Sequence, residues 1–544
     1  EMCIRDRRGL NPSRSSKVLL LEDGAPIQPS LFISNASYYS PPIDRISRIE
    51  VLKGASGLQY GPSNIGGVIN YLSKTPASGI KLTGKVGNFG YRLAELEAGG
   101  KSDSNGAIGG INLIQSESNG YQNNGFKMYD VLVKGGLQID QNQWLSLKYT
   151  HYDNNINTSY VGLRPNQYAA NSGINPAPND RFITQRNAVD INHSLEINSD
   201  TRLNTLLYWS KLDRDYWRQS ILDRNQDATV FKPCNTGADC QAGRNREFQM
   251  LGLDSRLIHG YKAFGISNEM ELGVRLHTES QSNQVVASQT LAHSGRLTMH
   301  EENKANSIAL YAQNRFLITP DFAIIPGVRV ESYNQNRSNV MTNKSGSAKN
   351  IETVPQIGAT WQLVPQAQIY SSIYKGFAPA QLATAIDDKG VDQQLAPERS
   401  TNIEMGLRGR SGGFSYDSAI FSMDFSNQIV NQSLASGISK ANGGQSLHQG
   451  AELSLGYQIG GGWSINTNAT YIPVARFVGT NSLGKDGKRI PYTPELTSNL
   501  GVNYQKNGFN TLLSLNYVSK QYADSANTIT QNTIGTIGEV PAFA

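Results

Sequence analysis

From about residue 80 onward, apolar and polar residues alternate with a period of two in runs of roughly 10 to 16 residues. In one run, Leu145, Leu147 and Tyr149 alternate with Ser146 and Lys148. Soluble strands average about 5 to 6 residues, whereas a tilted strand that crosses a bilayer needs about 9 to 11. The runs therefore predict an all-β, antiparallel transmembrane barrel rather than a soluble sandwich, and no repeat of propeller length occurs.

The composition agrees with a large closed sheet. The 544 residues are 38% hydrophobic and 17% charged, with 53 Gly and 25 Tyr. Because lipid-facing and lumen-facing residues alternate, a barrel keeps its mean hydropathy low. No apolar run approaches the roughly 18 residues of a membrane helix. The net charge of +5 comes from scattered basic residues and indicates no nucleic-acid partner.

Short turns, such as 140–142 and 319–321, alternate with long irregular segments. The two kinds of connection therefore belong to opposite rims, which is typical of short periplasmic turns and long external loops. Counting the runs predicts about nineteen strands. Long segments are expected near 157–185, 218–244, 282–302, 338–350, 379–397, 429–444, 478–488 and 524–540.

Residues 8–79 differ in kind from the barrel region 80–544. Residues 18–21 have the pattern of a buried strand that leads into a tight turn, and 43–53 mixes strand and helix signals. No linker rich in Pro or Ser separates this stretch from the first barrel strand. We therefore expect a small α+β unit folded inside the barrel lumen.

Two stretches of this unit resemble the plug signature of TonB-dependent receptors. They are Arg-Ile-Glu-Val-Leu-Lys-Gly at 48–54 and Gln-Tyr-Gly-Pro-Ser-Asn-Ile-Gly-Gly-Val-Ile-Asn-Tyr-Leu at 59–72, preceded by Leu-Glu-Asp-Gly at 21–24. In the barrel, 374–381 and 395–408 look like the seventh external loop of that family and the strand that returns from it. The form Gly-Phe-Ala-Pro at 376–379 most resembles ferric dicitrate-type receptors.

This resemblance implies TonB-dependent import of a ferric siderophore, with ferric citrate as a candidate, across the bacterial outer membrane. It implies a monomer in outer-membrane lipid, energised by the TonB–ExbB–ExbD complex. The iron would travel in the ligand, and no intrinsic cofactor is expected. Receptors for cobalamin, haem, nickel or oligosaccharide are alternatives within the family. A passive channel or adhesin is the alternative outside it, against which the plug signature argues.

We expect both ends of the receptor to be missing from this chain. Residues 8–79 would be the C-terminal part of the plug, without the TonB box, and nothing shows whether a signalling domain precedes it. A family barrel has about 22 strands, and residues 539–544 look like the start of another one. Residues 1–7 resemble translated sequencing-adapter sequence, so they are set aside together with Cys3.

Charged residues on the barrel strands are expected to face the lumen, because a charge on the lipid face costs about 2–4 kcal/mol at the midplane. In the resembling family, plug arginines pair with barrel glutamates at positions that match Glu404 and Glu452. The resemblance implies Arg45, Arg48 or Lys53 as partners in an electrostatic lock between plug and barrel. A hydrated lumen wall without specific pairs is the alternative.

A ferric siderophore is typically anionic and rich in oxygen, so its site should offer Arg, Gln or Thr donors and aromatic walls beneath the external loops. Each candidate could equally be an ordinary rim residue. The candidate ligand contacts are Gln28, Arg214, Arg218, Arg244 and Gln381.

Cys234 and Cys240 bracket a short turn-rich segment, which predicts a disulfide formed in an oxidising compartment. A metal site is the alternative, but that segment contains no His to complete a ligand set. The seven His residues are dispersed, and no catalytic motif or close nucleophile–base spacing occurs. We therefore expect no enzyme activity and no metal site.

Overall fold

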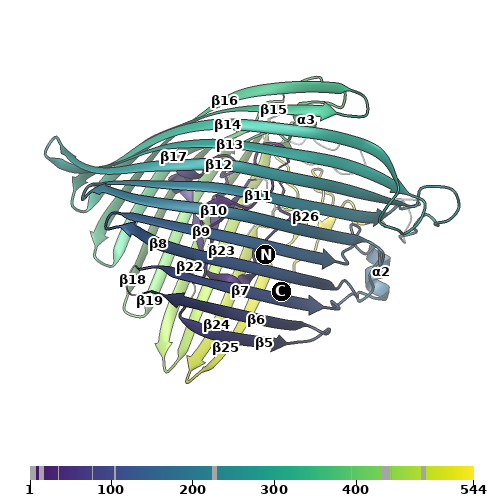
Figure 1. Ribbon diagram of the computed structural model, residues 1–544, viewed down its shortest axis with the longest axis horizontal. Helices are drawn as coiled ribbons and strands as arrows, with labels where there is room; N and C mark the ends of the chain where they lie inside the picture. The colour runs from purple at the N-terminus through teal and green to yellow at the C-terminus, as the bar shows by residue number, and fades with distance from the viewer. Residues whose placement is uncertain are drawn as a thin grey trace.

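Nineteen consecutive antiparallel strands among the described residues form a closed barrel (Figure 1). The computed structural model describes residues 8–10, 17–34, 36–75, 77–102, 106–222, 229–393, 395–427, 429–430, 441–442, 444–479 and 486–544. The barrel strands are β5 (Gly79–Val86), β6 (Arg92–Lys101), β7 (Ile108–Ser118), β8 (Phe126–Asp140), β9 (Gln143–Ile156), β10 (Arg181–Asn198), β11 (Thr201–Gln219), β12 (Gln241–Ala263), β13 (Ile266–Ser288), β14 (Arg296–Thr319), β15 (Phe322–Asn339), β16 (Lys344–Val364), β17 (Ala367–Ala378), β18 (Glu398–Ser411), β19 (Phe414–Phe425), β22 (Gln445–Gly460), β23 (Trp463–Val478), β24 (Leu496–Lys506) and β25 (Phe509–Val518). The predicted transmembrane barrel is confirmed.

Alternation along the strands sorts side chains between lipid and lumen as predicted. Ile403 and Met405 are each 51% exposed on the outside of β18, whereas Glu404 between them is 2% exposed. Arg329 and Glu331 on β15 are likewise buried. The lumen wall is therefore charged, and it faces a protein interior rather than open water.

The longest strands exceed the predicted 10 to 16 residues. Strands β12 and β13 have 23 residues each, and β14 has 24. Because about 9 to 11 tilted residues cross a bilayer, these strands continue beyond it as hairpins. The predicted long loops at 282–302 and 338–350 are therefore wrong, since most of their residues belong to β13–β16.

Short turns and long connections lie at opposite rims. Two residues join β8 to β9 and two join β14 to β15, whereas 24 residues join β9 to β10 and carry α2 (Pro165–Ala170). Helix α2 lies at the right-hand rim in Figure 1. The described helices are too short or too polar to cross a membrane. The remaining loop elements are α3 (Leu382–Ala385) and the strand pairs β20 (Ile429–Val430) with β21 (Ala441–Asn442), and β26 (Gln521–Tyr522) with β27 (Glu539–Val540).

Four predicted loops fall partly outside the described residues, namely 218–244, 379–397, 429–444 and 478–488. The segment 539–544, predicted to begin another barrel strand, contains the two-residue β27, which pairs with β26 in a separate sheet. Farther along the same segment, Phe543 forms an isolated antiparallel bridge with Val518 at the end of β25, the last described barrel strand, as the prediction requires. The expectation of about 22 strands for the whole family barrel concerns sequence outside this chain and stays a prediction.

A four-stranded sheet in order β2-β1-β4-β3 lies inside the barrel, where the purple N-terminal segment is seen in Figure 1. Leu19 of β1 and Leu58 of η3 belong to one buried apolar cluster with Tyr333 of β15 and Phe377 of β17. The inner unit and the barrel therefore share a core. The inner elements are β1 (Leu19–Glu22), β2 (Ala25–Pro26), η2 (Ile43–Arg45), β3 (Ile46–Leu52), η3 (Gly54–Tyr60) and β4 (Val68–Ser73).

Candidate functional site

A pocket of about 520 Å³, here called the outer pocket, opens among the long loops at the ends of β10, β11 and β12. Five cationic side chains and one carboxylate line it, together with five aromatic rings. Cations therefore outnumber acids in the pocket. These side chains are Arg214, Arg218, Arg244, Arg246, Lys232 and Asp180, with Tyr38, Tyr160, Phe182, Tyr216 and Phe231.

Strand pairing brings the arginines together. Arg214 on β11 lies opposite Arg246 on β12, and Tyr216 lies opposite Arg244. Like charges directly opposite each other in a sheet are destabilising unless something compensates them. An anion placed between these strands would supply that compensation.

Tyrosines orient the arginines from the inner unit and from the loops. The Arg214 guanidinium lies 4.6 Å from the ring centre of Tyr38, and Arg246 Nη1 donates to the Tyr38 hydroxyl at 2.9 Å. Arg218 lies 3.9 Å from the ring centre of Tyr160. Such contacts stabilise the positively charged guanidinium group without neutralising its charge. The pocket therefore keeps a positive character beside flat aromatic surfaces.

The one acidic group of the pocket is already engaged by the loop. Asp180 Oδ1 accepts from the backbone N–H of Gln219 at 2.9 Å, and Oδ2 accepts from that of Tyr160 at 3.2 Å. Burial raises the pKa of the Asp180 carboxyl in spite of these bonds. Asp180 thus ties the loop before β10 to the end of β11 and to the segment at Tyr160.

The predicted disulfide between Cys234 and Cys240 is present, with sulfur atoms 2.05 Å apart. It closes the loop between β11 and β12. The backbone N–H of Cys240 donates to Ser288 O at 2.9 Å, which ties the loop to β13. The same loop places Lys232 and Phe231 at the outer pocket.

The outer pocket brings together three of the five predicted ligand contacts, Arg214, Arg218 and Arg244. The other two lie elsewhere. Gln28 is fully buried in the inner unit, where its Oε1 accepts from Leu20 N and its Nε2 donates to Val18 O. Gln381 precedes α3, whose Ala385 N–H donates to the Gln381 carbonyl. Neither Gln28 nor Gln381 lines the outer pocket.

Sequence reasoning missed Tyr38, Tyr160, Phe182, Phe231 and Lys232. Only Tyr38 could have been found from the sequence, because it belongs to a Tyr-Tyr pair at 38–39 in the inner unit. Nothing local marks Tyr160 or Phe182, whose position depends on loop closure across β10 and β11. Phe182 and Tyr216 meet edge to face, with ring centres 5.2 Å apart.

Of the three predicted plug partners of Glu404 and Glu452, Lys53 does meet Glu452, while the arginine that meets both glutamates is Arg8, which was not predicted. Arg8 Nη2 lies 2.6 Å from Glu404 and 2.9 Å from Glu452, and Lys53 Nζ lies 3.1 Å from Glu452. Burial opposes the charge on Arg8, but the carboxylates of Glu452 and Glu404 outweigh it and raise the pKa of Arg8. Arg48 of β3 instead forms an exposed pair with Glu50 at 2.8 Å.

Arg45 belongs to a second buried cluster against β8 and β9. Its guanidinium lies 2.5 Å from Glu22 and 2.8 Å from Asp130 of β8. Lys148 of β9 lies 2.9 Å from Asp23 and 3.4 Å from Glu22. This cluster, rather than the one at Glu404, is where Arg45 joins the inner unit to the barrel.

A barrel carboxylate on β13 binds the apex of the inner unit. Glu279 accepts from Ser30 Oγ at 2.7 Å and from the backbone N–H groups of Leu31, Phe32 and Ile33 at 2.8 to 2.9 Å. A carboxylate that accepts several backbone N–H groups makes strong, charge-assisted bonds. The apex is therefore fastened to the β13 wall.

The backbone conformation at Gly61 explains why the signature at 59–72 has a glycine at this position. It has φ +104°, and a Cβ there would lie 2.9 Å from Arg275 Nη1. Arg275 donates to Tyr60 O at 2.5 Å, and Arg329 donates to Gln59 O at 3.2 Å. Glycine thus lets the backbone approach two barrel arginines closely.

Among the residues that the structure describes, no group of three or more His, Cys, Asp or Glu side chains is placed to hold a metal ion. The chemistry that the outer pocket supports is recognition of an anion by guanidinium groups and aromatic rings.

Comparisons with known proteins agree with this arrangement. The family model described as "TonB dependent receptor-like, beta-barrel" matches residues 83–544, and the one described as "TonB-dependent Receptor Plug Domain" matches residues 6–68. The catecholate siderophore receptor Fiu of Escherichia coli K12 is 22% identical over 84% of this chain and 69% of its own length. The pesticin receptor of Yersinia enterocolitica is 22% identical over 90% of this chain and 73% of its own length.

Solved structures show the same fold. The ferric citrate transporter FecA, unliganded, has a TM-score of 0.84 at 21% identity, covering 98% of this chain and 80% of that one. The ferric yersiniabactin uptake receptor FyuA of Yersinia pestis has a TM-score of 0.76 at 17% identity, covering 98% and 82%.

Proposed function

The chain belongs to the TonB-dependent receptor family of the bacterial outer membrane, and from this premise we propose that it imports a ferric siderophore. In this proposal the inner unit is the plug, residues 8–79, and residues 80–544 are the barrel. The ligand binds in the outer pocket, and the TonB–ExbB–ExbD complex supplies the energy that moves the plug. The receptor acts as a monomer in outer-membrane lipid.

The observation that carries the proposal is the cationic and aromatic lining of the outer pocket. Siderophores bind iron through carboxylate, catecholate or hydroxamate oxygens, and many of their ferric complexes are anionic. Guanidinium groups donate in pairs to such oxygens, and tyrosine rings pack against planar chelating groups. Arg214 and Arg246, opposite each other on β11 and β12, would share the charge of one ligand.

The iron in this proposal is cargo that the siderophore carries, and the protein needs no cofactor of its own. Ferric citrate is the first ligand to test, because 376–379 resembles the ferric dicitrate-type receptors. A relative is named as a catecholate siderophore receptor, so a ferric catecholate is the second. Both ligands present oxygen atoms and negative charge to the outer pocket.

Plug release is the second half of the proposed mechanism. Arg8, with Glu404 and Glu452, and Arg45, with Glu22 and Asp130, hold the plug at two separate walls. Buried ion pairs give little net stability relative to hydrated groups, so water that enters as the plug is pulled can replace them. Such ion pairs would hold the plug in one position in the resting receptor and would still let it separate from the barrel wall during transport.

The test is binding of ferric citrate and a ferric catecholate to the purified receptor in detergent, with Arg214 and Arg218 both replaced by Ala. Two lost charge-assisted contacts should weaken binding by about a hundredfold or more. Arg202→Ala is the matched control, since Arg202 is exposed on β11 at the opposite rim. Unchanged affinity in the double variant would contradict the proposed site, and selective binding of cobalamin, haem or an oligosaccharide would contradict the ligand class.

A further inference from the structure

A pocket of about 680 Å³, here called the rim pocket, lies beside the outer pocket at the rim of the long connections. Three parts of the chain build it, namely the turn between β7 and β8, the loop that carries α2 and the segment after β25. Among the described residues that line the rim pocket, none is charged. Its polar side chains include Gln122, Asn124, Thr158, Asn175, Gln531 and Tyr168.

Hydrogen bonds join the three parts of the chain around the rim pocket. Arg164 Nη1 donates to Ile534 O at 2.8 Å, which connects the α2 loop to the segment after β25. Gln122 Nε2 donates to Ser172 O at 2.7 Å, which connects the turn between β7 and β8 to the α2 loop. The walls of the rim pocket are therefore held by bonds between residues 370 and 50 positions apart.

Three charged residues adjoin lining residues in the sequence, and each is engaged by another part of the protein. Arg164 donates to the carbonyl just described. Asp524 Oδ2 accepts from the backbone N–H of Gly538 at 3.1 Å, and Glu539 pairs with Lys520 at 3.0 Å. The rim pocket therefore keeps an uncharged lining although charges lie close to it along the chain.

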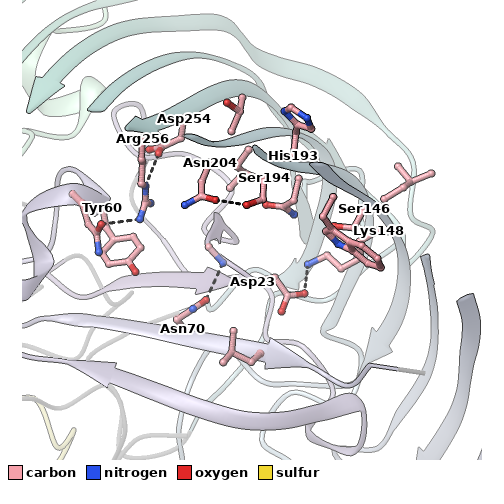
Figure 2. Close-up of a pocket in the computed structure, with 18 of the residues that line it drawn as sticks. Asp23, Tyr60, Asn70, Ser146, Lys148, His193, Ser194, Asn204, Asp254 and Arg256 are labelled. Carbon is pink, nitrogen blue, oxygen red and sulfur yellow. Dashed lines mark hydrogen bonds and ion pairs between the residues drawn. The ribbon is translucent and has the colours of Figure 1, made fainter. Parts of the chain in front are cut away.

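The pockets of this receptor differ in their charge. In a pocket of about 470 Å³ between plug and barrel, cations face carboxylates, and Figure 2 shows Lys148 beside Asp23 and Arg256 beside Asp254. In the outer pocket, cations outnumber acids. Because burying a charge without a partner is costly, the rim pocket suits an uncharged group. Its amide and hydroxyl side chains both donate and accept, as the hydroxyl or amide groups of such a ligand would.

A single stretch of chain separates the rim pocket from the outer pocket. Thr158 and Ser159 line the rim pocket, Tyr160 lines the outer pocket, and Val161 lines both. From the side of the outer pocket, the Tyr216 hydroxyl donates to Thr158 O at 3.4 Å. Together the two volumes exceed the roughly 300–1,000 Å³ that is usual for one small-molecule site. The two pockets are therefore placed to hold two parts of one large ligand.

We propose that the rim pocket binds an uncharged arm of the siderophore, rich in hydroxyl or amide groups, while the anionic ferric chelate occupies the outer pocket. This inference rests on the proposed function and narrows it to a siderophore larger than citrate. Gln122 and Asn124 face the arm with amide groups. Tyr168, which is 65% exposed, offers a ring against which a sugar or a peptide can pack.

Three ferric chelates labelled with ⁵⁵Fe test the proposal in binding assays with the purified receptor in detergent. The first is a tris-catecholate without an arm, the second carries glucose on the same chelator, and the third carries a short serine-rich peptide. At least one chelate with an arm should bind about tenfold tighter than the chelate without one, as one or two added hydrogen bonds would give. The glucose and peptide forms distinguish hydroxyl from amide recognition. Equal affinity of all three chelates would overturn the inference.

A substitution that fills the rim pocket locates the arm. Gly162 lines the rim pocket, and a Cβ there meets no atom within 4 Å, so Gly162→Trp can be accommodated. It should weaken the chelate with the arm by about tenfold and leave the chelate without it within about twofold. Ala170→Trp is the matched control, because Ala170 is exposed at the end of α2 and does not line the rim pocket. Unchanged binding in Gly162→Trp, or equal weakening of both chelates, would overturn the inference.

Tyr168→Ala tests the rim pocket without adding volume to it. The loss of this exposed ring should weaken only the chelate with the arm, by about threefold to fivefold. Replacing Arg214 and Arg218 together by Ala should instead weaken both chelates, since both place the ferric centre in the outer pocket. If the parent receptor binds neither ferric citrate nor any of the three chelates, the proposed function fails and the inference falls with it. Binding of the chelates without any gain from an arm overturns the inference alone.

Discussion

The arginines of the outer pocket and those that hold the plug differ in what surrounds their charge. Arg8 and Arg45 are buried, and each lies within ion-pair distance of two carboxylates. Arg214 and Arg218 lie instead over tyrosine rings in a pocket where cations outnumber acids. In the first arrangement two carboxylates surround each guanidinium, whereas in the second aromatic rings and other cations surround it. Substitutions should therefore act on stability at one place and on binding at the other.

Removing Arg45 should have the largest effect on stability. Arg45→Met leaves Glu22 and Asp130 buried without their guanidinium, which should lower the free energy of unfolding by about 3–5 kcal/mol. Urea unfolding of the detergent-solubilised protein measures this change. Arg48→Met is the control, because the exposed Arg48–Glu50 pair should contribute at most about 1 kcal/mol. Equal effects of the two substitutions would contradict the distinction between buried and exposed arginines.

The stability that Glu22 contributes should depend on pH. Burial opposes its charge, but Arg45 and Lys148 outweigh burial and lower the pKa of Glu22 below its ordinary value of 4.5. The contribution is therefore present above about pH 4.5 and is lost as pH falls through the lower pKa of the folded state. Glu22→Gln should cost about 2–3 kcal/mol at pH 7.

The measurement for Glu22 is the difference in unfolding free energy between the parent and Glu22→Gln from pH 7 downward. This difference should shrink below pH 4.5, where the parent begins to lose its advantage. A difference that stays constant from pH 7 to pH 3 would rule out the ionised Glu22 as its source.

The disulfide should stabilise the loop over the outer pocket more than the barrel. Replacing Cys234 and Cys240 by Ser releases a short loop, and its closure is worth about 2 kcal/mol. Hydrogen exchange should increase at residues 229–240, while the strand amides of β11 and β12 keep their protection. Unchanged exchange in the loop would mean that its hydrogen bond from Cys240 to Ser288 is sufficient by itself.

The smallest effect should come from the ring beneath Arg218. Tyr160→Leu removes a ring 3.9 Å from the guanidinium, which should raise the Kd of the ferric siderophore by about threefold to fivefold without a change in unfolding. Tyr160→Phe keeps the ring and should keep the affinity. A loss of affinity in Tyr160→Phe that equals the loss in Tyr160→Leu would place the contribution in the hydroxyl group instead.

The strand alternation predicted which charged residues face the lumen, because the period of two is local in the chain. The resemblance to the receptor family identified Glu404, Glu452 and Lys53 as members of a cluster but not Arg8, which lies 396 residues from Glu404. Three arginines of the outer pocket were predictable because they flank one loop. Tyr38 joins them only because the plug apex rises beneath that loop.

By itself, the sequence determined the barrel, the plug signature and the disulfide, since each rests on periodicity or spacing within a short stretch. Only the tertiary structure decided which wall each plug residue meets. That choice places Arg45 at β8, Arg8 at β18 and Ala25 against β11. The physical reason is that the plug packs inside a closed surface, where its contacts join residues hundreds of positions apart and leave no local pattern.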